Sequence, residues 1–126
     1  MAVKDANLNL EKEDLSMMGV LLGNGAGGLD TTQIACLDMQ EKGAMKINPF
    51  FIPMILPNMA AAQISRIFGL TGYTSTVITA CAAGNQAIGE AMEVIRRGTS
   101  DVVVAGGCEA GISRIGLGGF HVIKAL

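Results

Sequence analysis

The sequence predicts an α/β protein whose strands are largely buried between helices. Two short runs, Met17 to Gly23 and Asp101 to Ala105, are almost wholly apolar, which is typical of strands covered on both faces. Segments with apolar residues at helical spacing separate these runs from a third, β-branched run. The resulting order of strand, helix, helix, strand, helix and strand favours α/β architecture.

The first part of the chain is expected to hold one strand and its flanking helices. Residues 1–6 are predicted to be the last turns of a helix. After the first strand and a glycine-rich loop, apolar residues at helical spacing predict a second helix. Asp30 or Thr31 is the expected N-cap of this helix, which should end at Lys42, just before Gly43.

The middle of the chain is dominated by prolines. All three lie in the apolar segment from Lys46 to Pro57, which is therefore predicted to be extended and irregular. Exposed loops are seldom so apolar, so this segment is expected to pack against a partner surface.

Two more helices and a strand are predicted before the last buried strand. Asn58 is expected to cap a helix that runs to Phe68, Tyr73 to Thr79 should form a strand, and Gly84 to Gly98 the following helix. The last stretch, Ile112 to Leu126, is glycine-rich and then helical.

Charge and cysteine usage exclude several classes of function. The net charge is −2 and no cluster of Lys and Arg alternates with aromatic residues, which argues against nucleic-acid binding. No apolar run approaches the roughly 20 residues of a membrane-spanning helix. Cys36, Cys81 and Cys108 have neither a C-x-x-C motif nor metal-ligand spacing to His121, so we expect no disulfide framework and no metal site. Free thiols fit a reducing cytoplasm.

The composition also indicates that something covers part of this chain. Hydrophobic residues make up 50% of it and charged residues only 16%. A free-standing domain of 126 residues has proportionally more surface to solvate, so more charge is expected. We therefore expect another segment or subunit to cover some of the apolar surface.

Cys81 stands where a β-branched run ends and small residues lead into a helix. The positive end of a helix dipole and its unpaired N–H groups stabilise a thiolate, the reactive form of cysteine. The same N–H groups can hold a developing oxyanion during acyl transfer. Position alone also allows a buried structural cysteine, which is the commoner fate of a free Cys.

Two glycine-rich segments invite a phosphate-binding interpretation. Gly23 to Gly28 matches G-x-G-x-x-G after an apolar strand, but a helix and the proline segment occupy the region where the acidic ribose partner is required. Tight backbone packing beside an active site is the favoured reading. Gly106 to Glu109 suggests a phosphate nest, yet a close-packed turn with a structural Glu109 is preferred.

Several segments share the order and spacing of one known family. They are Thr79-Ala80-Cys81-Ala82-Ala83-Gly84, Ala87-Ile88-Gly89-Glu90-Ala91, Ile95-Arg96-Arg97-Gly98, Asp101 to Gly107 and Leu117-Gly118-Gly119-Phe120, with Gly23 to Leu29 and Asn48 to Pro53 upstream. Together they closely resemble the β-ketoacyl-[acyl carrier protein] synthases of the thiolase-like superfamily, above all the type II synthases of bacterial fatty-acid synthesis.

The resemblance implies a fold and a reaction. The fold would be the layered αβαβα thiolase-like fold, of which residues 1–126 would be part of the N-terminal half, truncated at both ends. The reaction would be decarboxylative Claisen condensation without a cofactor, in which Cys81 accepts the acyl group and its N–H is one oxyanion donor. The family's two catalytic histidines and its lysine lie further downstream, so this chain is not expected to be active alone, and His121 is expected to be an ordinary helix residue.

The resemblance also implies a pocket and partners. Ala26 matches the residue that gates the depth of the acyl pocket and is often larger, Phe120 a pocket-lining phenylalanine, and Phe51 one that reaches the partner subunit's pocket across a homodimer. Lys46 and Lys124 match basic residues that face the acidic acyl carrier protein. The expected partners are the acyl and malonyl forms of that carrier, and the cytoplasmic location expected from the free thiols is compatible with them.

Two other functions remain open at this point. A non-catalytic partner subunit that sets chain length lacks the nucleophile, so Cys81 argues against it. A ketosynthase of a polyketide pathway shares the cysteine and the fold. Its usual motif has serines after the cysteine, however, and this chain has Ala82-Ala83-Gly84.

Overall fold

A three-stranded parallel sheet forms the centre of the computed structural model, which describes all 126 residues. The strands are β1 (Met18–Gly23), β2 (Thr74–Val77) and β3 (Val102–Gly107), in the order β2-β1-β3. Every residue of β1 is buried, as its continuous apolar run predicted. β3 was expected to be buried as well but is only half-buried, because it lies at the edge of the sheet with β1 as its one neighbour.

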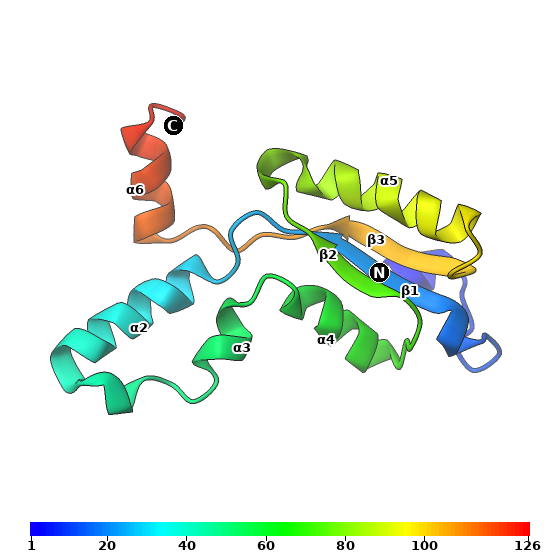
Figure 1. The fold of residues 1–126 in the computed structure, drawn as a ribbon, viewed down its shortest axis with the longest axis horizontal. Coiled ribbons are helices and arrows are strands. Elements are labelled where there is room, and N and C mark those ends of the chain that lie inside the picture. Colours follow the sequence, from blue (N-terminus) through cyan, green and yellow to red (C-terminus); the bar gives the residue numbers. More distant parts are fainter.

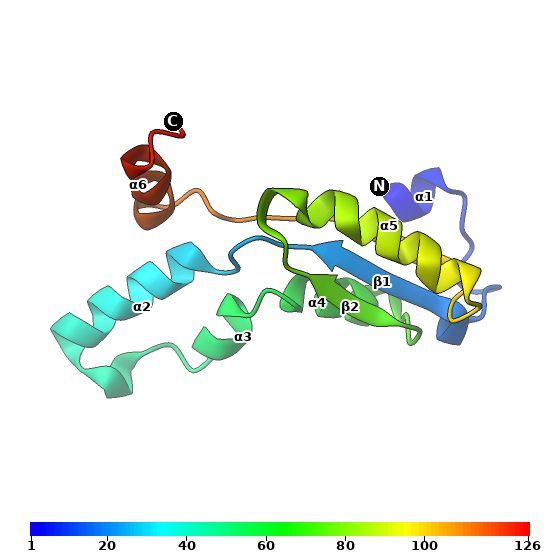
Figure 2. The same ribbon diagram turned by 45° about the horizontal axis from the view of Figure 1, so that its top comes forward.

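Two helices cover opposite faces of this sheet. Figures 1 and 2 place α5 (Ala83–Arg96) on one face and α4 (Met59–Phe68) on the other. The side chains of β1 alternate between them, since successive residues of a strand point to opposite faces. Leu21 packs against α5, whereas the three residues Met18, Val20 and Leu22 pack on the α4 side.

The two resulting cores hold the layers together. On the α5 side, Leu21 lies among Ala87, Ala91 and Val94. On the α4 side, the β1 residues lie with Ala61 and Leu70. Full burial of a Val, Leu or Met side chain contributes roughly 1.5–3 kcal/mol each, so these few contacts fix both helices on the sheet.

The remaining elements precede the sheet or extend beyond it. They are the helices α1 (Ala2–Asp5), α2 (Leu29–Lys42), α3 (Phe51–Ile55) and α6 (Arg114–Val122), and the short 3-10 helices η1 (Leu15–Met17), η2 (Ala44–Lys46) and η3 (Ala80–Ala82). Figures 1 and 2 show α2, α3 and α6 at one end of the molecule, beyond the carboxyl ends of the strands. None of the helices is both long enough and apolar enough to span a membrane.

The prediction that Lys46 to Pro57 is wholly extended is wrong, because α3 forms inside it. Pro53 is the third residue of this helix, within the first turn, where a backbone N–H has no partner inside the helix. A proline there costs no helical hydrogen bond.

The predicted helix caps are partly wrong. α2 begins at Leu29 with Gly28 as its N-cap, two or three residues earlier than a cap at Asp30 or Thr31 implies, and no side chain caps it. Asn58 does precede α4, but its side chain makes no capping hydrogen bond. At the other end of α4, Gly69 terminates the helix in the left-handed conformation with φ 69°.

Candidate active site

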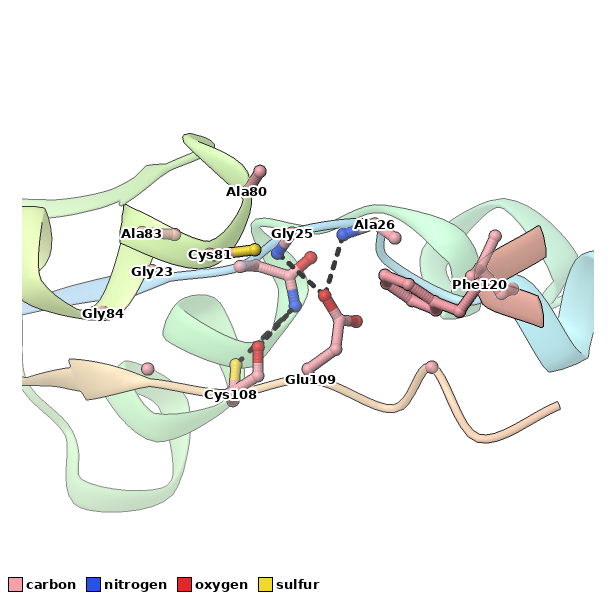
Figure 3. Close-up of a pocket in the computed structure, with 14 residues that line it drawn as sticks. Gly23, Gly25, Ala26, Ala80, Cys81, Ala83, Gly84, Cys108, Glu109 and Phe120 are labelled. Carbon is pink, nitrogen blue, oxygen red and sulfur yellow. Dashed lines mark hydrogen bonds between the residues drawn. The ribbon is translucent and has the colours of Figure 1, made fainter. Parts of the chain in front are cut away.

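The loops that follow the three strands meet at the carboxyl edge of the sheet and enclose a pocket of about 530 Å³. In open α/β sheets this edge is where ligands bind. Glycines, alanines and apolar side chains make up most of the lining, and Figure 3 shows how they are arranged. The lining residues are Gly23, Asn24, Gly25, Ala26, Leu29, Ala80, Cys81, Ala83, Gly84, Gly107, Cys108, Glu109, Gly111 and Phe120.

Cys81 lies on this pocket, in η3 between β2 and α5. Its side chain is exposed, so it is not the buried structural cysteine that position alone allowed. The preceding residue, Ala80, has φ 49°, a left-handed conformation that is uncommon for a residue with a side chain. Two residues after the thiol, the 14-residue helix α5 begins, so the sulfur sits by its positive end.

A close backbone contact fixes the start of α5 over the sheet. A Cβ on Gly23, at the end of β1, would lie 2.2 Å from the carbonyl oxygen of Ala83, so only glycine fits there. The same compactness appears between β3 and α5, where a Cβ on Gly107 would lie 3.0 Å from the Cα of Gly84. The position of Cys81 therefore depends on small residues at the ends of two strands.

The loop after β1 is tied to the loop after β3 by hydrogen bonds. The backbone N–H of Cys108 donates to the carbonyl of Gly23 at 2.9 Å, and the side-chain amide of Asn24 donates to the carbonyl of Cys108 at 2.9 Å. The N–H groups of Gly25 and Ala26 both donate to Oε2 of Glu109, at 2.8 and 2.9 Å. Figure 3 shows the bonds from Glu109 to Gly25 and Ala26 as dashed lines.

These bonds bear on the prediction of phosphate binding by the Gly23 to Gly28 loop. A phosphate in the Gly23 to Gly28 loop needs free backbone N–H groups. Here the Glu109 carboxylate takes the N–H groups of Gly25 and Ala26, and the N–H of Gly27 donates to Oδ1 of Asn24 at 2.7 Å. A carboxylate at that position also repels an anion, so the loop packs against protein rather than presenting a nucleotide site.

The structure brings together three of the residues that the sequence singled out. Ala26, Cys81 and Phe120 all line the pocket. Phe51 does not; it is half-buried on α3. No group of three or more His, Cys, Asp or Glu side chains is placed to hold a metal ion.

Both lysines lie outside the pocket. Lys46 ends η2, and Lys124 follows α6 with φ 57°; both are exposed. His121 is an exposed residue of α6 and does not line the pocket, in keeping with an ordinary helix residue.

Sequence reasoning missed other residues of the site. Asn24, Leu29 and Cys108 were not predicted to belong to the pocket, although they line it. Glu109 also lines the pocket, whereas the sequence indicated only a structural residue in a turn. The available signal was topological: Asn24 follows β1 directly and Cys108 follows β3 directly, and the ends of parallel strands meet at one edge.

Fold and site together define a class of protein: an α/β protein that presents a thiol at the amino end of a helix, beside an apolar pocket at the carboxyl edge of a parallel sheet. Residues 1–126 match the family model described as beta-ketoacyl synthase, N-terminal domain. The chain therefore belongs to the β-ketoacyl synthase family, as its motifs predicted.

Curated relatives are similar over this whole chain. The 3-oxoacyl-[acyl-carrier-protein] synthase 2 of Staphylococcus aureus is 40% identical over 125 residues, and that of Rhizobium meliloti (strain 1021) is 46% identical over 127 residues. These matches cover 99% and 100% of this chain but 31% and 30% of the relatives. The chain thus spans less than a third of the length of these relatives.

A solved structure is similar in fold. It contains a type II polyketide acyl carrier protein in complex with its ketosynthase bound to a hexaketide. One chain of it superimposes with a TM-score of 0.92 at 27% identity, over 98% of this chain and 36% of that one. The predicted thiolase-like α/β fold is confirmed.

Proposed function

We propose that residues 1–126 are part of the N-terminal half of a β-ketoacyl-[acyl carrier protein] synthase that elongates fatty acids. The observation that carries this proposal is the exposed thiol of Cys81 beside the pocket, two residues before α5 begins. A thiol at that place can form a covalent acyl intermediate, which divides a difficult condensation into two easier steps.

In the first step, the Cys81 thiolate attacks the carbonyl carbon of an acyl thioester on acyl carrier protein. The negative charge that develops on the carbonyl oxygen is stabilised by the amino end of α5 and by the backbone N–H of Cys81. The carbon–sulfur bond to the carrier then breaks, and the carrier leaves as a thiol after taking up a proton. The acyl group is now a thioester of Cys81.

In the second step, malonyl carrier protein binds and loses CO2. The electron pair left on the α-carbon attacks the acyl carbonyl on Cys81, and the cysteine leaves as a thiolate. The product is a β-ketoacyl group on the carrier. The family resemblance assigns the promotion of decarboxylation to histidines and a lysine outside residues 1–126, so this chain supplies the acyl-accepting half of the mechanism.

The acyl chain needs an apolar place to lie while it is bound to Cys81. Ala26 and Phe120 line the pocket beside the thiol and are proposed to contact the chain. Ala26 is small where the family often has a bulkier residue, which favours tolerance of longer or branched chains. No cofactor takes part in this scheme.

The proposed assembly is a homodimer in the cytoplasm. It is supported by the exposed apolar side chains around α3, which include Phe50 at 69% and Ile52 at 57% exposure. A partner subunit would cover this surface, and Phe51 would reach the partner's acyl pocket. A monomeric mass for the full-length protein in solution would contradict this assembly.

A ketosynthase of a polyketide pathway is the second candidate. The similar fold of a chain in the polyketide carrier and ketosynthase complex favours it. Against it stand the curated synthase 2 relatives, at higher identity, and the absence of serines after Cys81. A non-catalytic chain-length subunit is disfavoured because Cys81 is present.

The test uses the full-length protein with purified acyl and malonyl carrier proteins. Wild-type protein should release CO2 and form the β-ketoacyl carrier, and Cys81→Ala should lose acyl transfer altogether. Cys36→Ala is the matched control, since Cys36 is an exposed cysteine of α2 away from the pocket, and it should keep wild-type turnover. Turnover of Cys81→Ala equal to that of the control would refute the proposal.

A further inference from the structure

Glu109, in the loop after β3, hydrogen-bonds to Gly25 and Ala26 in the loop after β1, which lie 84 and 83 residues earlier in the sequence. We propose that it is a positioning residue for substrate selection: its carboxylate holds the pocket wall at Ala26 in the place that a long acyl chain needs. This inference rests on the proposed synthase function and adds a residue to it.

The contacts of Glu109 all point to this role. One oxygen, Oε2, accepts from two consecutive backbone N–H groups, those of Gly25 and Ala26, at 2.8 and 2.9 Å. The other, Oε1, accepts from the N–H of Ala110 at 3.1 Å, within its own loop. The ion pairs in the chain are Lys42 with Asp38 and Arg96 with Glu93, so Glu109 forms none. Its carboxylate is committed to the loop that carries Ala26.

A glycine and a second set of hydrogen bonds accompany this contact. A Cβ on Gly25 would lie 2.7 Å from Oε2 of Glu109, so a glycine is required for the carboxylate to approach the loop this closely. Asn24 adds a second tie to the same loop: it is only 7% exposed, its side-chain amide donates to the Cys108 carbonyl, and its Oδ1 accepts from the N–H of Gly27. Ala26 is thus an exposed residue of a loop that side chains of both Glu109 and Asn24 hold.

The position of the loop that Glu109 holds should affect the rate of transfer of long acyl chains much more than that of short ones. Ala26 and Cys81 line the same pocket, and a chain on Cys81 fills more of that pocket as it grows longer, so a long chain depends more than a short one on the wall at Ala26. Misplacement of a site by about 1 Å can cost on the order of a hundredfold in rate, so release of the loop should affect the long chain selectively.

The experiment measures acylation of Cys81 in the full-length protein, by intact mass, with hexanoyl and tetradecanoyl carrier proteins. For Glu109→Ala, the tetradecanoyl rate should fall about tenfold and the hexanoyl rate less than twofold. Glu109→Gln keeps a side-chain oxygen that can accept both N–H groups and should restore most of the ratio. Glu13→Ala removes an exposed carboxylate far away in the sequence and should leave both rates unchanged.

Each outcome decides the proposal. If both rates fall equally in Glu109→Ala, or neither falls, Glu109 does not position the acyl wall. Should that variant fail to unfold cooperatively, Gly25→Ala perturbs the same contact from the other side and must show the same selective loss. Failure of wild-type protein to accept either acyl group would instead refute the synthase function itself.

Discussion

Two residues of the pocket are central to the proposed function. Cys81 has an accessible thiol, and the amino end of α5 lies beside it. Ala26 lines the same pocket, and a larger side chain at that position would shorten the pocket. In the proposed function, Cys81 is the nucleophile and Ala26 limits the length of the acyl chain that the pocket accommodates.

Ala26→Ile should reverse the tolerance for long chains. The added methyl and methylene groups would occupy pocket volume, and exclusion of a methylene from an apolar site is worth roughly tenfold or more in rate. We expect the full-length variant to lose about tenfold in turnover with long acyl carrier proteins and little with short ones. Unchanged selectivity in a chain-length series would contradict the assignment of Ala26.

The position of Cys81 between a strand and a helix could be predicted from the sequence, but the contacts of Glu109 could not. A β-branched run followed by small residues and a helical pattern is a local signal, and it located the junction at Cys81. The bonds of Glu109 to Gly25 and Ala26 depend on which strands are neighbours in the sheet, and no local pattern encodes that.

At the scale of elements, the site depends on the close packing of α5 on the ends of β1 and β3. Gly23 and Gly107 allow this approach, and through it they set where Cys81 lies. The burial of β1 could be predicted, because its residues are continuously apolar and neither face of the strand carries polar side chains. The short helix α3 was not, because its prolines indicate extended structure unless one of them falls in a first turn.

Gly23→Ala tests the packing of α5. The new Cβ would lie 2.2 Å from the Ala83 carbonyl, so α5 must shift, and overpacking of this kind costs about 1–3 kcal/mol of unfolding free energy. Denaturant unfolding of the full-length variant should show this loss, and alkylation of Cys81 by iodoacetamide should slow.

The control for that variant is the double substitution Gly23→Ala with Ala83→Gly. It should not restore stability, because the collision is with a backbone carbonyl and not with the Ala83 side chain. Full recovery in the double variant, or no change in the single one, would show that this contact does not hold α5 in place.

On the scale of the whole molecule, the chain has a large apolar surface. Only 18 of its 126 residues are buried, and the exposed side chains include Ile88, Met92 and Ile95, which lie along one side of α5 away from the sheet. The sequence predicted such a surface from 50% hydrophobic and 16% charged residues. It could not predict which elements carry it, because that follows from the tertiary arrangement.

The proposed docking of the acidic carrier protein at Lys46 and Lys124 also concerns the molecule as a whole. Both lysines are exposed, Lys46 at the end of η2 and Lys124 just after α6. Lys46→Glu and Lys124→Glu should each raise KM for the acidic carrier a fewfold with little change in kcat, and more so at low salt. Lys12→Glu, between α1 and η1, is the control. Equal KM values in all three variants would contradict the docking assignment.

The central claim is that Cys81 carries the acyl group, and peptide mapping tests it most directly. The full-length protein is incubated with acyl carrier protein alone, without malonyl carrier, and digested under conditions that preserve thioesters. We predict one acyl adduct, on the peptide that contains Cys81, and none on those with Cys36 or Cys108. An adduct on another cysteine, or an unmodified Cys81 peptide while acyl transfer proceeds, would contradict the account.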